Sequence, residues 1–322
     1  MKHSRIAGTG SYLPEKVLTN FDLEKMMDTS DQWIRERTGI ERRHIAASGE
    51  TTVDLAERAA RAALDAAGVR PSDVDFIAFG TTTPDMFFPN CGALLQARLG
   101  CRGAAAFSVE TACSGFMYAL SIADKFVRFG DAHRALVIGA ETLSRITDWT
   151  DRSTAVLFAD GAGAVVLEST DQPGILSTHV HADGTYKDLL FCGGGLGVND
   201  TDPAKARRAI TMTGSEVFKI AVTTLARAID EALAANELER SAIDWLVPHQ
   251  ANMRIIQATA RKLDMPMERV ITTVQNHGNT SAASVPLALD TGVRDGRIKR
   301  GDLLLLEAFG GGVTWGSALI RY

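Results

Sequence analysis

Cys113 is the residue of this sequence best placed to act as a chemical nucleophile. It lies within residues 110–116, which read ETACSGF. A strand-like stretch at 106–109 precedes it, and a helical stretch at 116–127 follows it. Small residues around the cysteine permit a sharp turn that exposes the thiol, and a helix N-terminus lowers a thiol pKa because it favours the thiolate. The competing interpretation is a buried structural cysteine, the usual fate of this residue type.

The other three cysteines lack this setting, so we interpret Cys91, Cys101 and Cys192 as structural. None of the four cysteines forms a C-x-x-C pair, and no cysteine–histidine cluster has the spacing of a zinc site. We therefore expect no metal and no resident cofactor.

Two further polar residues have positions typical of a site. His249 directly follows the apolar run 243–247, and the carboxyl end of a buried strand is where an α/β fold places its site residues. Asn279 lies in the segment NHGNTS, where a glycine beside amide side chains predicts a tight loop with polar groups aimed at a pocket. His277, in the same segment, is the competing histidine.

A glycine-rich stretch supplies the other expected part of a site. Gly310, Gly311 and Gly312 follow the predicted strand 303–306, and glycines let backbone amides approach a ligand as an oxyanion hole requires. The glycines of residues 193–197 lack the spacing and context of a dinucleotide-binding fingerprint.

The elements that must position these residues repeat along the chain. Residues 53–68 read as an amphipathic helix and residues 74–79 as a buried strand. Residues 217–235 and 243–247 repeat this order, and residues 64–78 align with 233–247 without a gap. A second pair of similar segments, 162–167 and 315–320, occurs in the same order. Self-similarity at long range indicates a duplicated α/β unit. The alternative is that any amphipathic helix followed by a strand looks alike.

The same pattern predicts the fold class and the division of the chain. Strands alternating with helices favour an α/β protein with mostly parallel sheets covered by helices. The segment STDQPG at 169–174 is a turn-rich break. We therefore expect an N-terminal half at 1–172, which carries Cys113, and a C-terminal half at 173–322, which carries His249 and Asn279.

Composition limits the classes of function. The 322 residues are 45% hydrophobic, as in a globular protein, and their net charge of −5 disfavours nucleic-acid binding. No signal-peptide pattern opens the chain, and no apolar run reaches the roughly 18 residues that span a bilayer. We expect a cytoplasmic protein with reduced thiols and no membrane partner.

With these residues assembled, the chain resembles the β-ketoacyl-acyl carrier protein synthase III family of the thiolase superfamily, from residue 6 to residue 322. The resemblance implies a duplicated five-layered αβαβα sandwich, which agrees with the repeat. The motifs that carry it are GTGSYLPEKVLTN, TSDQWIRERTGIERRHIA, GTTTPD, ETACSGF, FADGAGAVVLE, PHQANMRII, NHGNTSAASVPLALD and EAFGGGVTWGSALIRY.

The resemblance also implies an activity and assigns roles to the three candidate residues. The first substrate is an acyl-CoA, either acetyl-CoA or another short primer, and it acylates Cys113. The acyl group is then condensed with malonyl-acyl carrier protein, which starts type II fatty acid synthesis. His249 and Asn279 match the pair that serves decarboxylation. Thiolases carry a second catalytic cysteine late in the chain, but the last cysteine here is Cys192, which excludes the usual thiolysis route.

Binding residues follow from the same motifs. The resemblance places at the coenzyme A entrance Trp33, Arg37, Thr38, Arg152 and Asn252. It places at the acyl pocket Phe158 and Phe88, the latter reaching into the partner subunit of a homodimer. It also implies a surface that docks acyl carrier protein, formed by Lys219, Arg254, Arg261 and Lys262.

Some features leave alternatives open. Residues 190–195 and 84–87 are less typical of the family and lie near the expected acyl pocket, so the choice of primer stays open. A specialised synthase III-like enzyme of secondary metabolism would keep the same three residues. A cysteine hydrolase and a non-enzymatic coenzyme A or lipid sensor are the other classes. Retention of all three catalytic residue types argues against the sensor.

Overall fold

Helix α3 (Thr52–Ala67) shows how local sequence sets the elements of this chain. The Thr51 side chain caps its N-terminus, and Gly68, with φ of 65°, ends it. The helix packs against strand β1 (His3–Tyr12). A Cβ atom on Gly10 of β1 would lie 2.4 Å from a backbone carbonyl oxygen of α3. The glycine therefore allows a close helix–strand contact.

The first sheet is built entirely from strands that precede residue 172. Its order is β1–β7–β6–β4–β5. The two pairs at the β1 side are antiparallel, and the two at the β5 side are parallel. The strands other than β1 are β4 (Phe76–Gly80), β5 (Ala105–Val109), β6 (Arg134–Thr142) and β7 (Asp160–Thr170).

The second sheet is built from strands that follow residue 173. Its order is β11–β12–β13–β8. Only the β11–β12 pair is parallel. The strands are β8 (Ile175–Ala182), β11 (Trp245–Pro248), β12 (Leu303–Gly310) and β13 (Thr314–Arg321).

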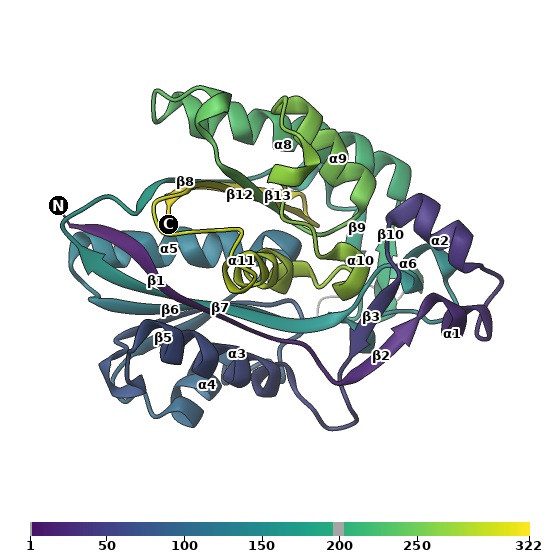
Figure 1. The fold of residues 1–322 in the computed structure, drawn as a ribbon. Coiled ribbons are helices and arrows are strands. Elements are labelled where there is room, and N and C mark those ends of the chain that lie inside the picture. The colour runs from purple at the N-terminus through teal and green to yellow at the C-terminus, as the bar shows by residue number, and fades with distance from the viewer. Residues whose placement is uncertain (1, 196–202) are drawn as a thin grey trace.

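Helices cover both faces of both sheets, as Figure 1 shows for this computed structural model, which describes residues 2–195 and 203–322. Helices α3 and α4 form one outer layer, α5 and α11 lie between the sheets, and α8 and α9 form the other outer layer. This is the expected five-layered αβαβα sandwich. The bounds are α4 (Cys91–Leu99), α5 (Gly115–Phe129), α8 (Gly214–Ala234), α9 (Met253–Lys262) and α11 (Ser284–Arg294).

Smaller elements extend one end of the sandwich, where β2 pairs with β3 beside α1 and α2 (Figure 1). Strands β9 and β10 form another antiparallel pair. These elements and the other short helices are β2 (Lys16–Thr19), β3 (Arg42–Ile45), β9 (Leu190–Cys192), β10 (Ile210–Met212), α1 (Asn20–Glu24), α2 (Asp31–Thr38), α6 (Arg152–Ala155), α7 (Pro203–Ala206) and α10 (Val274–His277).

The predicted repeat corresponds to equivalent parts of the two sheets. Helix α3 leads to β4 as α8 leads to β11, and each helix covers the outer face of its sheet. The prediction of mostly parallel sheets was wrong, because both sheets are mixed. Strands covered on both faces by helices read as continuous apolar runs whether they pair parallel or antiparallel, so their direction is not visible in the sequence. The division into halves at 172 stays a prediction.

No helix within residues 2–195 and 203–322 has both the length and the apolar character needed to cross a bilayer. The same residues contain no group of three or more histidine, cysteine or acidic side chains able to hold a metal ion.

Candidate active site

A cavity of about 640 Å³ brings together three residues that are far apart in the sequence. Cys113, His249 and Asn279 all line it. Each comes from the end of a different strand or loop, and all three are buried, with exposed fractions of 7%, 6% and 5%. The sequence prediction of a cysteine, histidine and asparagine set therefore corresponds to one enclosed space.

The turn that carries Cys113 has a constrained backbone. After β5 the chain forms a single 3₁₀ turn, η2 (Ala112–Ser114), and α5 begins directly after it. Ala112 has a φ of 47°, in the left-handed region that residues other than glycine rarely adopt. The turn is also packed closely from the second sheet, because a Cβ on Gly310 would lie 2.8 Å from the Cys113 nitrogen. These constraints hold the thiol at the start of the helix.

The thiol pKa differs from the sequence expectation. Burial raises the pKa of Cys113 to about 12, and the charge of Glu141 adds to this shift. Hydrogen bonds from Ser281 and from the backbone of Cys113 itself act in the opposite direction but do not outweigh burial. The expectation that the helix N-terminus lowers this pKa was therefore wrong for the free protein. In the free protein the thiol is therefore neutral.

The other cysteines lie away from the cavity lining. Cys91 and Cys101 are fully buried, and burial raises the pKa of each thiol to about 11. Cys192 is exposed on β9, so burial in the core does not explain it.

His249 is fixed by its backbone and by its ring. Its N–H donates to the Glu307 carbonyl oxygen at 2.8 Å, which continues the pairing of β11 with β12 by one residue. Its ring Nδ1 lies 2.5 Å from the hydroxyl oxygen of Ser284, the first residue of α11. Burial lowers the pKa of His249 to about 3, so the ring is neutral at physiological pH.

Asn279 is held in a loop between α10 and α11. Its backbone pairs with the segment after α6: the Asn279 N–H donates to Leu157 O, and the Ala159 N–H donates to Asn279 O, each at 2.9 Å. Its side-chain oxygen accepts from the Ser281 N–H at 2.9 Å. That bond orients the amide so that its NH₂ group, a donor, is the part left for a ligand.

The competing histidine does not line the cavity. His277 ends α10, and its ring meets the His44 ring edge-on at 6.5 Å. Burial lowers the pKa of His277 to about 4, with a further contribution from His44.

The glycine stretch lies beside the nucleophile. Gly310 ends β12 against the Cys113 turn, as described above. Gly311 packs against the Leu190 carbonyl oxygen, and Gly312 has a φ of 118° that favours glycine. The adjoining Phe309 lines the cavity. The oxyanion role of the Cys113 and Gly310–Gly312 amides stays a prediction.

Helix α2 supplies most of the expected coenzyme A residues. Trp33, Arg37 and Thr38 line the cavity, as does Asn252 from the N-cap of α9. The guanidinium carbons of Arg37 and Arg152 lie 4.5 and 4.7 Å from the centre of the Trp33 ring. Arg152 does not line the cavity itself. The structure thus places both arginines at the Trp33 ring, and Thr38 and Asn252 on the cavity that this ring also lines.

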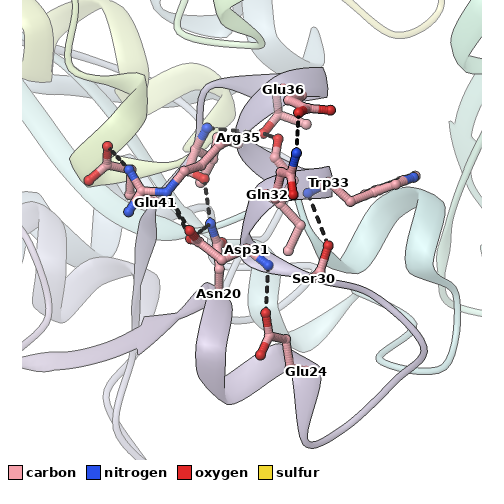
Figure 2. A network of polar contacts seen from close by, with 12 residues as sticks. Asn20, Glu24, Ser30, Asp31, Gln32, Trp33, Arg35, Glu36 and Glu41 are labelled. Carbon is pink, nitrogen blue, oxygen red and sulfur yellow. Dashed lines mark hydrogen bonds and ion pairs between the residues drawn. The ribbon is translucent and has the colours of Figure 1, made fainter.

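A polar network holds α2 in place, as Figure 2 shows. The Ser30 hydroxyl accepts from the Trp33 N–H at 3.1 Å and caps the helix. Arg35 pairs with both Asp31 and Glu41. In Figure 2 the Trp33 side chain extends away from this network. The helix can therefore present its ring while its other face is anchored.

The two residues expected at the acyl pocket lie in different places. Phe158 is buried and lines the cavity beside Asn279. Phe88 is 85% exposed and does not line the cavity of its own chain.

The expected docking cations lie on α8 and α9. Lys219 and Arg254 are exposed at the lining of the cavity, whereas Arg261 and Lys262 are exposed in the last turn of α9. Lys219 also pairs with Glu216 at 3.3 Å.

Sequence reasoning missed several residues that shape the site. Ser284 contacts the His249 ring and Gln250 donates to Ser284, although both residues fall inside motifs that carry the resemblance. Most of the apolar lining was also missed, although residues 190–195 had been placed near the acyl pocket. The missed side chains include Val156, Leu157, Met212, Val217, Phe218, Ala221, Leu225 and Ile255. Only the position of these side chains in space distinguishes them from ordinary core residues.

The five-layered fold and the convergent cysteine, histidine and asparagine define a thiolase-fold condensing enzyme. Comparison with known proteins supports this class. Two family models match: 3-oxoacyl-[acyl-carrier-protein] synthase III at residues 107–184, and the C-terminal part of the same family at residues 233–322. The β-ketoacyl-[acyl-carrier-protein] synthase III of Alkalilimnicola ehrlichii is 64% identical over 323 residues, which is 100% of both chains.

Solved structures share the fold over nearly the whole chain. The 3-oxoacyl-[acyl-carrier-protein] synthase III of Aquifex aeolicus VF5 is 47% identical with a TM-score of 0.93, over 99% of this chain and 100% of that one. The priming β-ketosynthase of the R1128 polyketide biosynthetic pathway is 37% identical with a TM-score of 0.94, over 99% and 96%. The chain belongs to the 3-oxoacyl-[acyl-carrier-protein] synthase III family. It is a condensing acyltransferase.

Proposed function

We propose that Cys113 carries the acyl group and that His249 and Asn279 serve the decarboxylation of the malonyl unit. The observation that supports this most directly is the orientation of the two polar residues. The ring Nδ1 of His249 and the side-chain oxygen of Asn279 already have partners, so Nε2 and the amide NH₂ remain for a ligand.

The first step is acylation of Cys113. Its sulfur attacks the carbonyl carbon of the acyl-CoA, the bond between that carbon and the coenzyme A sulfur breaks, and the thiol proton ends on the departing coenzyme A. The backbone N–H groups of Cys113 and of the Gly310–Gly312 stretch are the proposed donors to the tetrahedral oxyanion.

The second step is decarboxylation and condensation. Malonyl-acyl carrier protein places its thioester carbonyl oxygen against His249 and Asn279. Loss of carbon dioxide leaves an enolate on that oxygen, and its carbon attacks the acyl carbonyl, which releases the Cys113 sulfur. A neutral donor pair suits this step, because a carboxylate in place of Asn279 would repel the enolate. The departing Cys113 thiolate takes up one proton from solvent, which restores the thiol. All electron pairs come from the substrates and from Cys113, so we propose no metal or cofactor.

Recognition of the two substrates is assigned to different parts of the surface. Trp33, flanked by Arg37 and Arg152, is the proposed platform for the coenzyme A adenine and its phosphates, with Thr38 and Asn252 beside it. The exposed cations of α8 and α9 are the proposed docking surface for the acidic carrier protein. They are Lys219, Arg254, Arg261 and Lys262.

The primer is proposed to be short, such as an acetyl or small branched acyl group. Phe158 lines the cavity next to Asn279, and the exposed Phe88 is proposed to close the acyl pocket of a second copy in a homodimer. We propose that the enzyme works in the cytoplasm, where its thiols stay reduced.

A specialised enzyme of secondary metabolism is the second candidate, because the R1128 priming ketosynthase shares the fold and 37% identity. The identity of 64% to the Alkalilimnicola ehrlichii synthase III favours fatty acid synthesis.

A primer panel tests this proposal. Purified enzyme, malonyl-acyl carrier protein and acyl-CoAs from two carbons upward, including branched ones, should give 3-ketoacyl-acyl carrier protein and carbon dioxide with the short primers. After incubation with acetyl-CoA alone, peptide mass spectrometry should find the acetyl group on Cys113. An acetyl group on Cys91, Cys101 or Cys192, with Cys113 unmodified, would sink the proposal.

A further inference from the structure

The ring of His249 has one hydrogen-bond partner to which the mechanism above assigns no role of its own. The Ser284 hydroxyl oxygen lies 2.5 Å from Nδ1 of His249. Ser284 is 1% exposed and begins α11, so a rigid element of the middle layer carries this hydroxyl. The contact joins residues 35 positions apart in the sequence.

A count of donors and acceptors fixes the direction of this bond. The Ser284 oxygen accepts from the Gln250 N–H at 3.3 Å. A serine hydroxyl has a single proton to donate. Within residues 2–195 and 203–322, Nδ1 of His249 is the one acceptor found for that proton. If Nδ1 itself carried a proton, the buried Ser284 hydroxyl would have no acceptor, which is unfavourable.

The second contact of Ser284 is itself firmly placed. The Gln250 side chain donates to Pro248 O at 2.7 Å and to Ile271 O at 3.0 Å. Its oxygen accepts from the N–H groups of Thr273 and Val274 at 2.8 and 3.1 Å. The bonds to Ile271, Thr273 and Val274 tie the segment after β11 to the segment that leads to α10. The Gln250 N–H therefore keeps its position as a donor to Ser284.

We propose that Ser284 is a positioning residue that holds the neutral His249 ring in the tautomer with its proton on Nε2. A neutral imidazole has two tautomers, and the hydrogen bond at one ring nitrogen decides which is present. With Nδ1 engaged as an acceptor, Nε2–H is a donor. Resting on the proposed function, this makes His249 a donor to the thioester carbonyl and excludes it as the base that deprotonates Cys113.

Heteronuclear NMR of the free wild-type protein, labelled with ¹⁵N at histidine, tests the tautomer without any substrate. A His249→Asn variant identifies the His249 signals by their loss. The expected result is an unprotonated Nδ1 and a protonated Nε2 at neutral pH. A protonated Nδ1 in the wild-type protein would overturn the proposal, whatever the enzyme turns over.

Three variants then test the role of Ser284. In Ser284→Ala we expect a mixture of tautomers and a fall in malonyl decarboxylation of about 10- to 100-fold, by analogy with the loss of a partner that orients a metal-binding histidine. Acylation of Cys113 by acyl-CoA should stay close to the wild-type rate. Ser284→Thr, which keeps the hydroxyl, should retain the single tautomer and most of the decarboxylation. Ser317→Ala is the matched control, because it removes a buried hydroxyl that donates to Ala228 O on α8.

The outcomes separate this inference from the proposed function. A Ser284→Ala protein with the wild-type tautomer and rate, or with equal losses in acylation and decarboxylation, would refute the positioning role. A wild-type enzyme that does not decarboxylate malonyl-acyl carrier protein would refute the proposed function. The NMR result on the free protein would still decide the tautomer.

Discussion

At the scale of single residues, burial is the dominant influence on the site. It raises the pKa of Cys113 to about 12 and lowers the pKa of His249 to about 3, so both groups are neutral in the free protein. A dry site strengthens each hydrogen bond to a developing negative charge. The two donors, His249 and Asn279, therefore need no charge of their own to stabilise an enolate.

Separate removal of these donors should separate the two half-reactions. In His249→Ala and in Asn279→Ala, acylation of Cys113 should continue, while release of carbon dioxide from malonyl-acyl carrier protein should fall by about 10²–10³. Peptide mass spectrometry follows the first step, and ¹⁴C carbon dioxide release follows the second. The assignment is wrong if both variants acylate poorly yet decarboxylate at the wild-type rate.

The pH dependence of decarboxylation follows from the neutral histidine. With the pKa of His249 lowered to about 3, its ring keeps one proton from pH 5 to pH 8. We expect the rate of decarboxylation at saturating malonyl-acyl carrier protein to show no step near pH 6.5, the usual histidine value. A step of one proton near that pH, present in wild type and absent in His249→Gln, would contradict this expectation.

At the scale of elements, the sequence predicted the features that depend on neighbouring residues in the chain, such as the ends of a helix. The ends of α3 agree with the predicted helix at 53–68 to within one residue, because Thr51 and Gly68 act through contacts with their own neighbours. The placing of Cys113 and His249 after strands was also predicted from the local pattern.

Contacts between distant residues could not be predicted in this way. Strand direction depends on pairing partners, and both sheets are buried on both faces, so the antiparallel pairs had no local signal. The thiol pKa of Cys113 depends on how completely the second sheet and the loop of Ser281 enclose it. The contact of Ser284 with His249 exists only because α11 begins beside the end of β11.

The exposed end of α9 offers a test of carrier-protein docking. Arg261→Glu with Lys262→Glu should raise the KM for malonyl-acyl carrier protein about tenfold, equivalent to about 1.4 kcal/mol. Neither residue lines the cavity, so the KM for acyl-CoA should change little. Steady-state kinetics at several salt concentrations provides the measurement, because exposed charges are screened within about 8–10 Å.

The matched control for this pair is Arg70→Glu. Arg70 is exposed, pairs with Asp73 and lies beside the outer layer formed by α3 and α4, on the other side of the sandwich from α9. It should leave both KM values unchanged. If the KM for malonyl-acyl carrier protein changes neither in the Arg261→Glu, Lys262→Glu variant nor with salt concentration, the cations of α9 do not bind the carrier protein.

At the scale of the whole molecule, the middle layer brings the two sheets to one site. Helix α5 begins beside Cys113, α11 begins beside Asn279 and Ser284, and the short turns before these helices contact each other. The second sheet adds His249 from β11 and packs Gly310 against the Cys113 turn. The site therefore requires both halves of the chain to be folded together.

The stability of the molecule should depend on Glu307, a fully buried carboxyl of β12 whose pKa burial raises to about 8. Between about pH 4.5 and pH 8 the folded chain keeps a proton on Glu307 that the unfolded chain has lost. Stability should therefore fall as pH rises through this window. In Glu307→Gln this decline should disappear, measured as Tm from pH 6 to pH 9.

The acid side provides an internal control for Glu307→Gln. The unfolded chain protonates His249 and His277 below about pH 6.5, whereas the folded chain does so only near pH 3 and pH 4. Stability should therefore fall as pH decreases below 6.5, and more steeply in Glu307→Gln than in wild type down to about pH 4.5, because Glu307 opposes the two histidines over that range. Equal alkaline declines in the two proteins would show that Glu307 does not carry the effect.

The assembly of two copies is the last property that the exposed surface predicts. Met86, Phe87 and Phe88 are all exposed, at 48%, 70% and 85%, and they follow one another in the chain. Three adjacent exposed apolar side chains are costly in water and are typical of a surface that a partner covers. A second copy of the chain, contacting this segment, is the partner that we propose.

If Phe88 closes the acyl pocket of that second copy, it limits the length of the primer. Each added methylene that fits contributes about 0.8 kcal/mol to binding, whereas one that does not fit costs roughly 1–3 kcal/mol through overpacking. The activity of the wild-type enzyme should therefore fall sharply with acyl length, and Phe88→Ala should accept longer acyl-CoAs. Initial rates across an acyl-CoA series, with light scattering to confirm a dimer, provide the measurement.

Phe129→Ala, which removes a ring that is 71% exposed at the end of α5, is the matched control and should keep the wild-type profile. A fully active monomer, or a wild-type preference for eight or more carbons, would contradict the role of Phe88, because either result removes the need for a ring from a second copy to end the pocket.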